Sequence, residues 1–236
     1  MSSFVMQGLK RLALPVVVLL GVMIALGLLV SRVLTSTGED AVNRELERQR
    51  TAELNDVSLV FSTIANTQVI IAVTGVAALA LYLWLRRWRE PAFLVAAVSA
   101  QALVFLLTTM AVDRQRPEVE RMDGSLPTSS FPSGHTSAAI ALYCGLALVL
   151  ALHTRRSGLK VTWWVLLLMI PLGVALTRMY RGMHHPTDIL GSLVNGVTCV
   201  VIMARGILDR TVEWGKAHLP AGRVPGQRRP VDSSRV

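Results

Sequence analysis

Charged residues are scarce in this chain of 236 residues, because Asp, Glu, Lys and Arg together make up only 17% of it. A soluble domain carries about 25% charged residues. Apolar residues make up 52% of the chain, and they are gathered in long blocks rather than spread along it. The composition excludes an ordinary soluble domain. It predicts an all-α, polytopic membrane protein whose core is its own helix bundle.

Cysteine is also scarce, and both residues, Cys144 and Cys199, lie inside apolar blocks. Free cysteines in such positions behave as small buried hydrophobes. No Cys-x-x-Cys or Cys/His spacing typical of a metal site is present. The net charge of +9 would suit a nucleic-acid-binding protein. However, the basic residues sit in short loops and in the tail, as in membrane proteins. We therefore expect membrane lipids, and no nucleic acid, as partners.

Six apolar blocks approach or exceed the roughly 20 residues that a helix needs to cross a bilayer. They cover residues 12–34, 57–85, 91–112, 136–152, 161–176 and 189–208. The first is longer than the apolar part of a signal peptide, and no clear cleavage site follows, so we expect a retained span. The second exceeds one crossing, which predicts a tilted or protruding helix. Residues 1–208 would then form one six-span domain.

Two polar segments complete the predicted organisation. Residues 35–57 carry opposite charges three or four apart, which favours a solvated surface helix that acts as a charged connector. Residues 209–236 form a basic tail rich in Pro and Gly, and we expect it to be partly disordered.

The distribution of Lys and Arg predicts the orientation in the membrane. Six spans put both termini on one side, which carries fifteen of the Lys and Arg residues against nine on the other. The positive-inside rule therefore places both termini in the cytoplasm. Residues 113–135 and 177–188 share the opposite, extracytoplasmic face, because two spans separate them. The compactness of the chain suggests a bacterial inner membrane.

The short gap between the last two apolar blocks runs from Thr177 to Asp188 and contains Arg178, Arg181, His184 and His185. Charge is costly beside hydrocarbon, so such a cluster is a functional-site candidate. Pro186 biases the residue before it toward an extended conformation, which predicts a turn into the next helix.

A carboxylate near an imidazole can hold the ring and stabilise its protonated form. His184 and Asp188 are therefore candidates for a nucleophile or base and its partner. Spacing alone does not rank His185 and Arg181, and the stretch alone would also fit a solvated loop.

A second stretch, Pro132-Ser133-Gly134-His135, opens the fourth apolar block. We expect Pro132 at the first helical position. A helix start presents free N–H groups and favours anions. Gly134 would let a phosphate reach the backbone, Ser133 could donate a hydrogen bond, and His135 would face the same anion. The motif alone fits an ordinary helix cap equally well.

A third stretch, Arg114-Gln115-Arg116-Pro117, falls on the same side of the membrane. A guanidinium group can bind two phosphate oxygens at once, in bidentate fashion, and it stays protonated at ordinary pH. Arg116 and Arg114 are therefore candidate phosphate ligands, although an arginine at headgroup level is also common in membrane proteins.

Together, the three ordered stretches resemble the signature of the type 2 phosphatidic acid phosphatase (PAP2) family. That pattern is Lys-x6-Arg-Pro, Pro-Ser-Gly-His and Ser-Arg-x5-His-x3-Asp. The last two motifs read here as residues 132–135 and as Thr177-Arg178-x5-His184-x3-Asp188. The resemblance covers most of residues 57–208 and implies an integral-membrane lipid phosphatase.

The resemblance also implies a role for each matching residue. His184 would attack phosphorus and form a phosphohistidine, Asp188 would orient it, and His135 would protonate the leaving oxygen. The remaining matches, Arg116, Arg178, Ser133 and Gly134, would hold the phosphate oxygens. It implies no metal and no other cofactor. The substrate would be a lipid phosphate or diphosphate, such as phosphatidic acid, phosphatidylglycerol phosphate or an isoprenoid diphosphate.

Two positions depart from the family pattern. Thr177 replaces a serine and keeps the hydroxyl group. Thr109 stands where the family has the lysine of its first motif, and the three lysines of the chain all lie elsewhere. Arg114 or Arg181 could replace that cation. Two alternatives therefore stay open: a lipid phosphotransferase, and a binder of lipid phosphates without catalytic activity.

Overall fold

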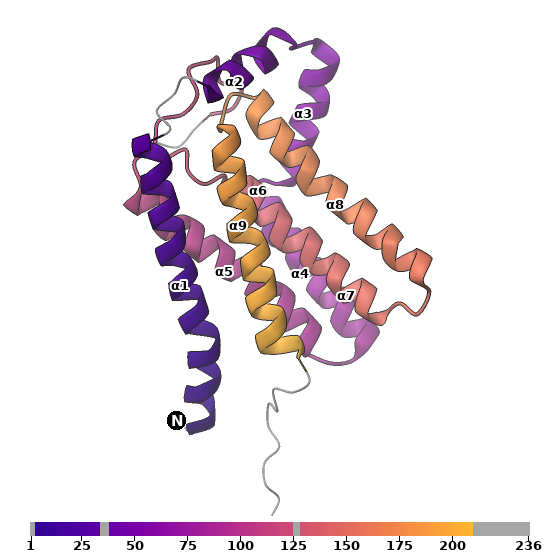
Figure 1. Cartoon of the computed structure of the whole chain (residues 1–236). Helices are drawn as coiled ribbons and strands as arrows, with labels where there is room; N and C mark the ends of the chain where they lie inside the picture. The colour runs from indigo at the N-terminus through magenta and orange to yellow at the C-terminus, as the bar shows by residue number, and fades with distance from the viewer. Residues whose placement is uncertain (1–2, 34–37, 125–127, 210–236) are drawn as a thin grey trace, which may run out of the picture.

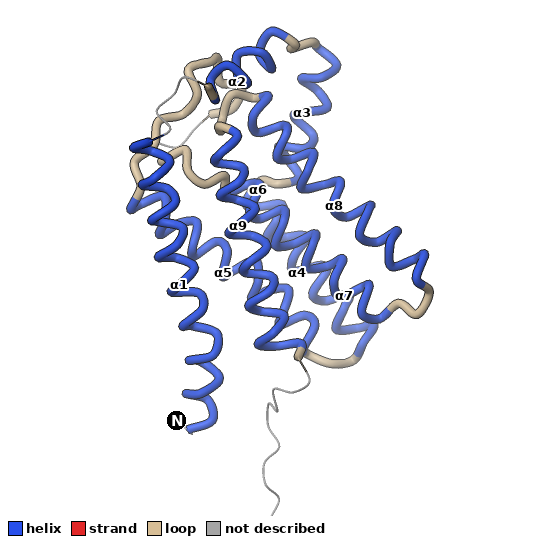
Figure 2. Tube along the Cα trace, in the orientation of Figure 1, coloured by secondary structure: helices blue, strands red, loops and turns tan. Residues whose placement is uncertain are grey.

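The computed structural model describes residues 3–33, 38–124 and 128–209, and the backbone alone for residues 3–11. The described residues form helices and no strand (Figures 1 and 2). The helices are α1 (Ser3–Val33), α2 (Glu39–Arg48), α3 (Ala52–Ile64), α4 (Thr67–Leu85), α5 (Arg89–Ala111), α6 (Gly134–Ala139), α7 (Gly145–His153), α8 (Ser157–Tyr180) and α9 (Pro186–Met203). π-Helical segments at Ile140–Cys144 and Ala204–Leu208 extend α6 into α7 and lengthen α9.

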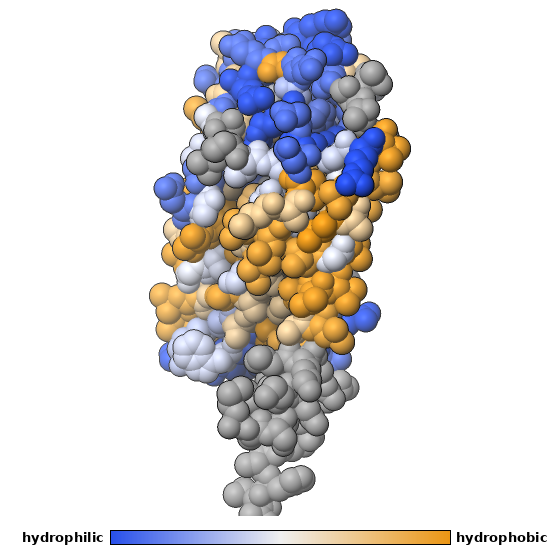
Figure 3. Space-filling view, turned by 90° about the vertical axis from the view of Figure 1, so that its left-hand side faces the viewer, coloured by the Kyte–Doolittle hydropathy of each residue, from blue (hydrophilic) through white to orange (hydrophobic). Residues whose placement is uncertain are grey.

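Six helical segments of the described chain are long and apolar enough to cross a membrane, which confirms the predicted six-span, all-α fold. They are Leu12–Val33, Thr67–Leu85, Arg89–Ala111, Gly134–His153, Ser157–Tyr180 and Pro186–Leu208. Figure 3 shows their apolar side chains as a band between a polar cap and a narrower polar edge. This is a multi-pass membrane protein.

The centre of the bundle is α5, which packs against α1, α4, α6 and α9. Its side chains Phe93, Leu94 and Ala97 are fully buried. Close packing of this kind, rather than a hydrophobic force between helices, holds spans together inside lipid. The span that begins at Gly134 lies against α5, α8 and α9, so it is held from three sides.

The second predicted block, 57–85, is not one helix. It breaks at Ala65–Asn66, where α3 ends and the side chain of Asn66 accepts a hydrogen bond from the N–H of Gln68 to start α4. A residue that caps a helix start in this way favours a new helix over a continued one. The prediction of one tilted or protruding helix over the whole block was therefore wrong. In the fifth block, α8 runs through Pro171 without a break.

The junction between α8 and α9 forms the turn that the sequence predicts. Gly182 adopts φ +69° just after α8 ends, a conformation that glycine reaches without strain. His185 is extended, and Pro186 is the first residue of α9. A Cβ at Gly182 would also lie 2.7 Å from the backbone oxygen of Glu120, so the turn packs tightly against the loop after α5.

The connector α2 lies over this turn and contacts α8 and α9 (Figure 1). Two of its polar residues, Asp40 and Asn43, are buried. The prediction of a solvated connector was therefore wrong for one face of this helix. Except for Asp209, the predicted basic tail lies outside the described residues.

Candidate active site

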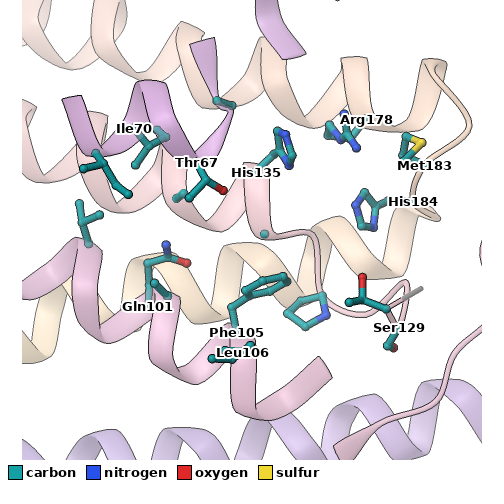
Figure 4. A pocket seen from close by; sticks show the side chains of 18 of the residues that line it. Thr67, Ile70, Gln101, Phe105, Leu106, Ser129, His135, Arg178, Met183 and His184 are labelled. Carbon is teal, nitrogen blue, oxygen red and sulfur yellow. The ribbon is translucent and has the colours of Figure 1, made fainter. Parts of the chain in front are cut away.

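A cavity of about 420 Å³ lies among α4, α5, α6 and the C-terminal end of α8. One part is lined by Arg116, His135, Arg178 and His184, and Figure 4 shows the two histidines and Arg178 facing the same space. The other part is lined mainly by apolar side chains of α4 and α5, including Ile70, Ile71, Val98, Ala102 and Leu106. The cavity therefore joins a basic, histidine-bearing end to an apolar one.

Hydrogen bonds tie the three sequence stretches together. The guanidinium of Arg116 donates to the backbone oxygen of Met183 at 2.7 Å, which links the loop after α5 to the turn before α9. The N–H of Ser133 donates to the Ser192 hydroxyl at 2.8 Å, which links the start of α6 to α9. The stretches that the sequence placed on one membrane face are thus one cluster.

His184 is held with a defined tautomer. Its Nδ1 lies 2.7 Å from the backbone oxygen of Ser130. Because a carbonyl oxygen only accepts hydrogen bonds, Nδ1 carries the hydrogen, and Nε2 of the neutral ring keeps its lone pair. Burial lowers the pKa of His184, and the nearby Asp188 carboxylate opposes this shift only in part. The ring is therefore neutral at neutral pH and can act as a nucleophile through Nε2.

Asp188 holds together the turn between α8 and α9, residues 181–185, which we call the histidine turn. It does not act on His184 alone. Its Oδ2 accepts from the Ser130 hydroxyl at 2.5 Å and from the His185 N–H at 2.8 Å. Its distance to Nδ1 of His184 is 3.7 Å, longer than a hydrogen bond. Asp188 thus fixes Ser130, and the backbone of Ser130 fixes the nucleophile candidate.

The start of α6 carries His135 into the cavity. Ser133 caps the helix, with its side-chain oxygen accepting from the N–H of Thr136, and Gly134 is the first helical residue. The expectation that Pro132 takes the first helical position was wrong. A Cβ at Gly134 would lie 2.8 Å from the ring of Phe105, so only glycine lets α5 and α6 approach this closely.

Two arginines line the cavity and differ in their partners. Arg178 pairs with Asp123 at 2.6 Å and bonds to Ser62 at 2.8 Å. Arg116 bonds to neutral oxygens, of Met183 and of Thr128, and forms no ion pair within the described part of the chain. Its full charge is therefore available for an anion.

The PAP2 superfamily model matches residues 92–211, a little more than half of the chain. The chain belongs to the PAP2 superfamily. The match contains all three motif stretches. No curated protein sequence matches the chain.

Two solved structures resemble this PAP2 protein in fold. One is a transmembrane PAP2-type phosphatidylglycerolphosphate phosphatase from Bacillus subtilis, with a TM-score of 0.71 and 20% identity over 80% of this chain and 93% of that one. The other is LpxE from Aquifex aeolicus, with a TM-score of 0.55 and 19% identity over 72% and 98% of the two chains. At this identity the likeness shows the fold alone.

Two predicted phosphate ligands of this PAP2 protein do not line the cavity. Arg114 is buried in ion pairs with Glu39 and Asp188, so it supports the histidine turn from behind. Ser133 is fully buried as the cap of α6. The geometry favours structural roles for both side chains over contact with phosphate.

The missing lysine is not replaced by either candidate arginine. Thr109 donates to the backbone oxygen of Leu106 and does not line the cavity. Arg181 is buried and pairs with Asp123 at 2.6 Å, and Arg114 is engaged behind the turn. Arg116 and Arg178 are therefore the cationic side chains that line the cavity within the described residues.

Sequence reasoning missed the polar support that α2 gives to the histidine turn. Asn43 donates to the backbone oxygens of His184 and Met179, at 3.1 and 3.2 Å. Asp40 lies 3.2 Å from Nε2 of His185, which explains why this second histidine does not line the cavity. Charge spacing in the segment predicts a helix but does not reveal which polar face is buried.

Asp123 was also missed, because the sequence shows it only as one of many acidic loop residues. It pairs with both Arg178 and Arg181. Burial would raise its pKa, but hydrogen bonding and charge from the two arginines outweigh burial and lower the pKa. The carboxylate therefore stays ionised well into the acidic range and occupies part of the anion-binding surface of Arg178.

Proposed function

We propose that this protein is an integral-membrane phosphatase that removes phosphate from a lipid phosphate or diphosphate. One observation carries the proposal: His184 and His135 face a single cavity that is basic at one end and apolar at the other. An anionic headgroup fits the basic end, and a lipid chain fits the apolar end. One of the two structural neighbours, the transmembrane PAP2-type phosphatidylglycerolphosphate phosphatase, agrees with this proposal.

The positions of the side chains support the following reaction. Arg116 and Arg178 bind the phosphate oxygens and stabilise negative charge as it spreads in the transition state. Nε2 of His184 attacks phosphorus, and the bond from phosphorus to the lipid oxygen breaks. His135 gives its proton to that oxygen, so the alcohol leaves neutral.

The resulting phosphohistidine is then hydrolysed. His135, now without its proton, takes one from water, whose oxygen attacks phosphorus and releases His184. The Ser130 carbonyl and Asp188 hold the His184 ring in place through both steps. Arg116 and Arg178 supply positive charge without a metal, so we expect turnover to persist in a chelator.

The site lies on the extracytoplasmic face in this proposal, with both termini in the cytoplasm of a bacterial cell. The excess of Lys and Arg on the opposite side of the membrane supports that orientation. Residues 1–208 act as one domain, because α1 packs against α5 and α9 rather than standing apart.

The first experiment measures phosphate release by detergent-purified protein in EDTA, with lipid mono- and diphosphates as substrates. His184→Ala should lower kcat at least about a thousandfold, because the nucleophile is lost. His153→Ala is the matched control, since His153 lies at the other end of the bundle beside Glu90. Undiminished release by His184→Ala would disprove the nucleophile assignment.

A lipid-phosphate binder without catalytic activity is the second candidate. It is favoured by Thr109 and by the fact that Arg114 and Arg181 are engaged elsewhere. It predicts saturable binding of a lipid phosphate with no release of phosphate. Retention of both histidines in one cavity favours the enzyme, because a binder needs cations more than a nucleophile.

A further inference from the structure

We propose that Gln101 recognises an ester carbonyl of the substrate, so that the substrate is a diacylglycerol-based lipid phosphate rather than an isoprenoid one. The inference rests on the proposed function and narrows its substrate class. It starts from a polar side chain in the part of the cavity where apolar residues dominate.

Gln101 is only 3% exposed, and it lines the cavity from α5. Its side-chain oxygen has no hydrogen-bond partner among the described residues. Figure 4 shows the carboxamide directed away from α5, toward Thr67 at the start of α4. Of the lining residues nearby, Ile70 and Val98 are apolar, and the Thr67 hydroxyl does not bond to the Gln101 oxygen.

The position of Gln101 is fixed by the bundle. Its backbone oxygen accepts a hydrogen bond from the Asn195 side chain of α9 at 3.2 Å. Asn195 is fully buried, and its own side-chain oxygen accepts from Cys199. This tether between α5 and α9 holds the carboxamide at one level of the cavity.

That level matches the glycerol backbone of a bound lipid. Gln101 lies one helical turn before Phe105, a rise of about 6 Å along α5. Phe105 packs against Gly134, next to His135. A phosphate held at the histidines would therefore place the first glycerol esters of a phosphatidic acid near Gln101.

The buried side-chain oxygen of Gln101 has no partner, which is costly, so a substrate that pairs with the carboxamide gains affinity over one that does not. The chain beside the phosphate of an isoprenoid is hydrocarbon and cannot pair. An ester carbonyl accepts a hydrogen bond from the amide N–H. The planar amide can turn over, so either its N–H or its oxygen can face the lipid.

The test compares three substrates of the full-length protein in detergent: a diacyl phosphatidic acid, its dialkyl ether analogue of equal chain length, and an isoprenyl phosphate. We expect kcat/KM for the diacyl lipid to exceed that of the other two by roughly tenfold or more. Gln101→Leu should bring the diacyl-to-dialkyl ratio close to one. Thr108→Val is the matched control on α5, because Thr108 is buried but bonds within its own helix.

Equal rates for diacyl and dialkyl lipids in the unaltered protein, or an unchanged ratio in Gln101→Leu, would overturn the inference and assign the carboxamide to bound water. Release from none of the lipids would contradict the proposed function instead. Binding of the same diacyl and dialkyl lipids to His184→Ala then decides the inference. Tighter binding of the diacyl lipid that disappears when Gln101→Leu is added supports it, and equal binding refutes it.

Discussion

The two ends of the cavity are built differently. At the histidine end, the ring of His184 is fixed by a backbone oxygen of another loop, and α2 and Asp188 brace that arrangement. At the other end, α4 and α5 present apolar side chains, and Ile71 and Leu106 are more than half exposed. Phosphoryl transfer needs fixed positions, whereas a lipid chain needs only an apolar surface. We therefore expect mutations at the first end to change kcat and mutations at the second to change KM.

The largest effect after loss of His184 should come from His135→Ala. Loss of a general acid lowers kcat by about 10²–10⁴-fold. The loss should shrink on a substrate with an acidic leaving alcohol, because that oxygen departs without a proton. Steady-state rates with alkyl and nitrophenyl phosphates measure this. An equal loss on both substrates would show that His135 binds phosphate rather than donating a proton.

The two arginines should differ in a predictable order. Arg116→Ala should lower kcat/KM by about 100-fold. Arg178→Ala should cost less, because Asp123 already offsets part of its charge.

The effect of Asp123 on Arg178 can be checked with Asp123→Asn in the otherwise unaltered protein. This variant removes the ion pair of Arg178, so inorganic phosphate should inhibit it more tightly. A weaker inhibition by phosphate in Asp123→Asn would show that the carboxylate positions Arg178 rather than competing with the anion.

The acidic limb of the pH profile of kcat/KM should lie at lower pH than it would for an ordinary histidine. Burial lowers the pKa of His184, so its Nε2 loses its lone pair only below the ordinary histidine range near pH ~6.5. As the pH is lowered, the rate should therefore hold constant to below pH ~6.5 and fall only at more acidic pH. The pH profile of kcat/KM measures this, with thermal unfolding across the same range as a control. A loss of rate on acidification that already begins above pH ~7 would contradict a neutral, buried His184.

The smallest effect should come from the apolar end. Leu106→Ala removes apolar lining surface from the end of the cavity where the proposed substrate would place its lipid chain. It should raise KM less than about tenfold and leave kcat unchanged, since uniform binding is lost. A large fall in kcat would mean that this end of the cavity also positions the phosphate, and the two ends would not be distinct.

Much of the fold could be predicted from the sequence, because hydrocarbon imposes long apolar helices that composition reveals. The meeting of His135, His184, Arg116 and Arg178 at one cavity could be predicted as well, since the motifs fall on one face by counting spans.

The break at Asn66 could not be predicted from the sequence, because apolar residues on both sides mask a capping residue. The burial of Asp40 and Asn43 could not be predicted either. A polar segment is predicted to be solvated unless its hydrogen-bond partners are known. The partners of Asp40 and Asn43 lie more than 130 residues away in the chain.

The break between α3 and α4 has a consequence for how a lipid reaches the site. With 19 residues, α4 spans about 28 Å, close to the ~30 Å thickness of the hydrocarbon layer. Thr67, at its first turn, already lines the cavity. For the proposed lipid phosphate substrate, the headgroup would thus enter at the depth it occupies in its own leaflet. The search for that substrate would be two-dimensional diffusion, and its alcohol product would stay in the bilayer.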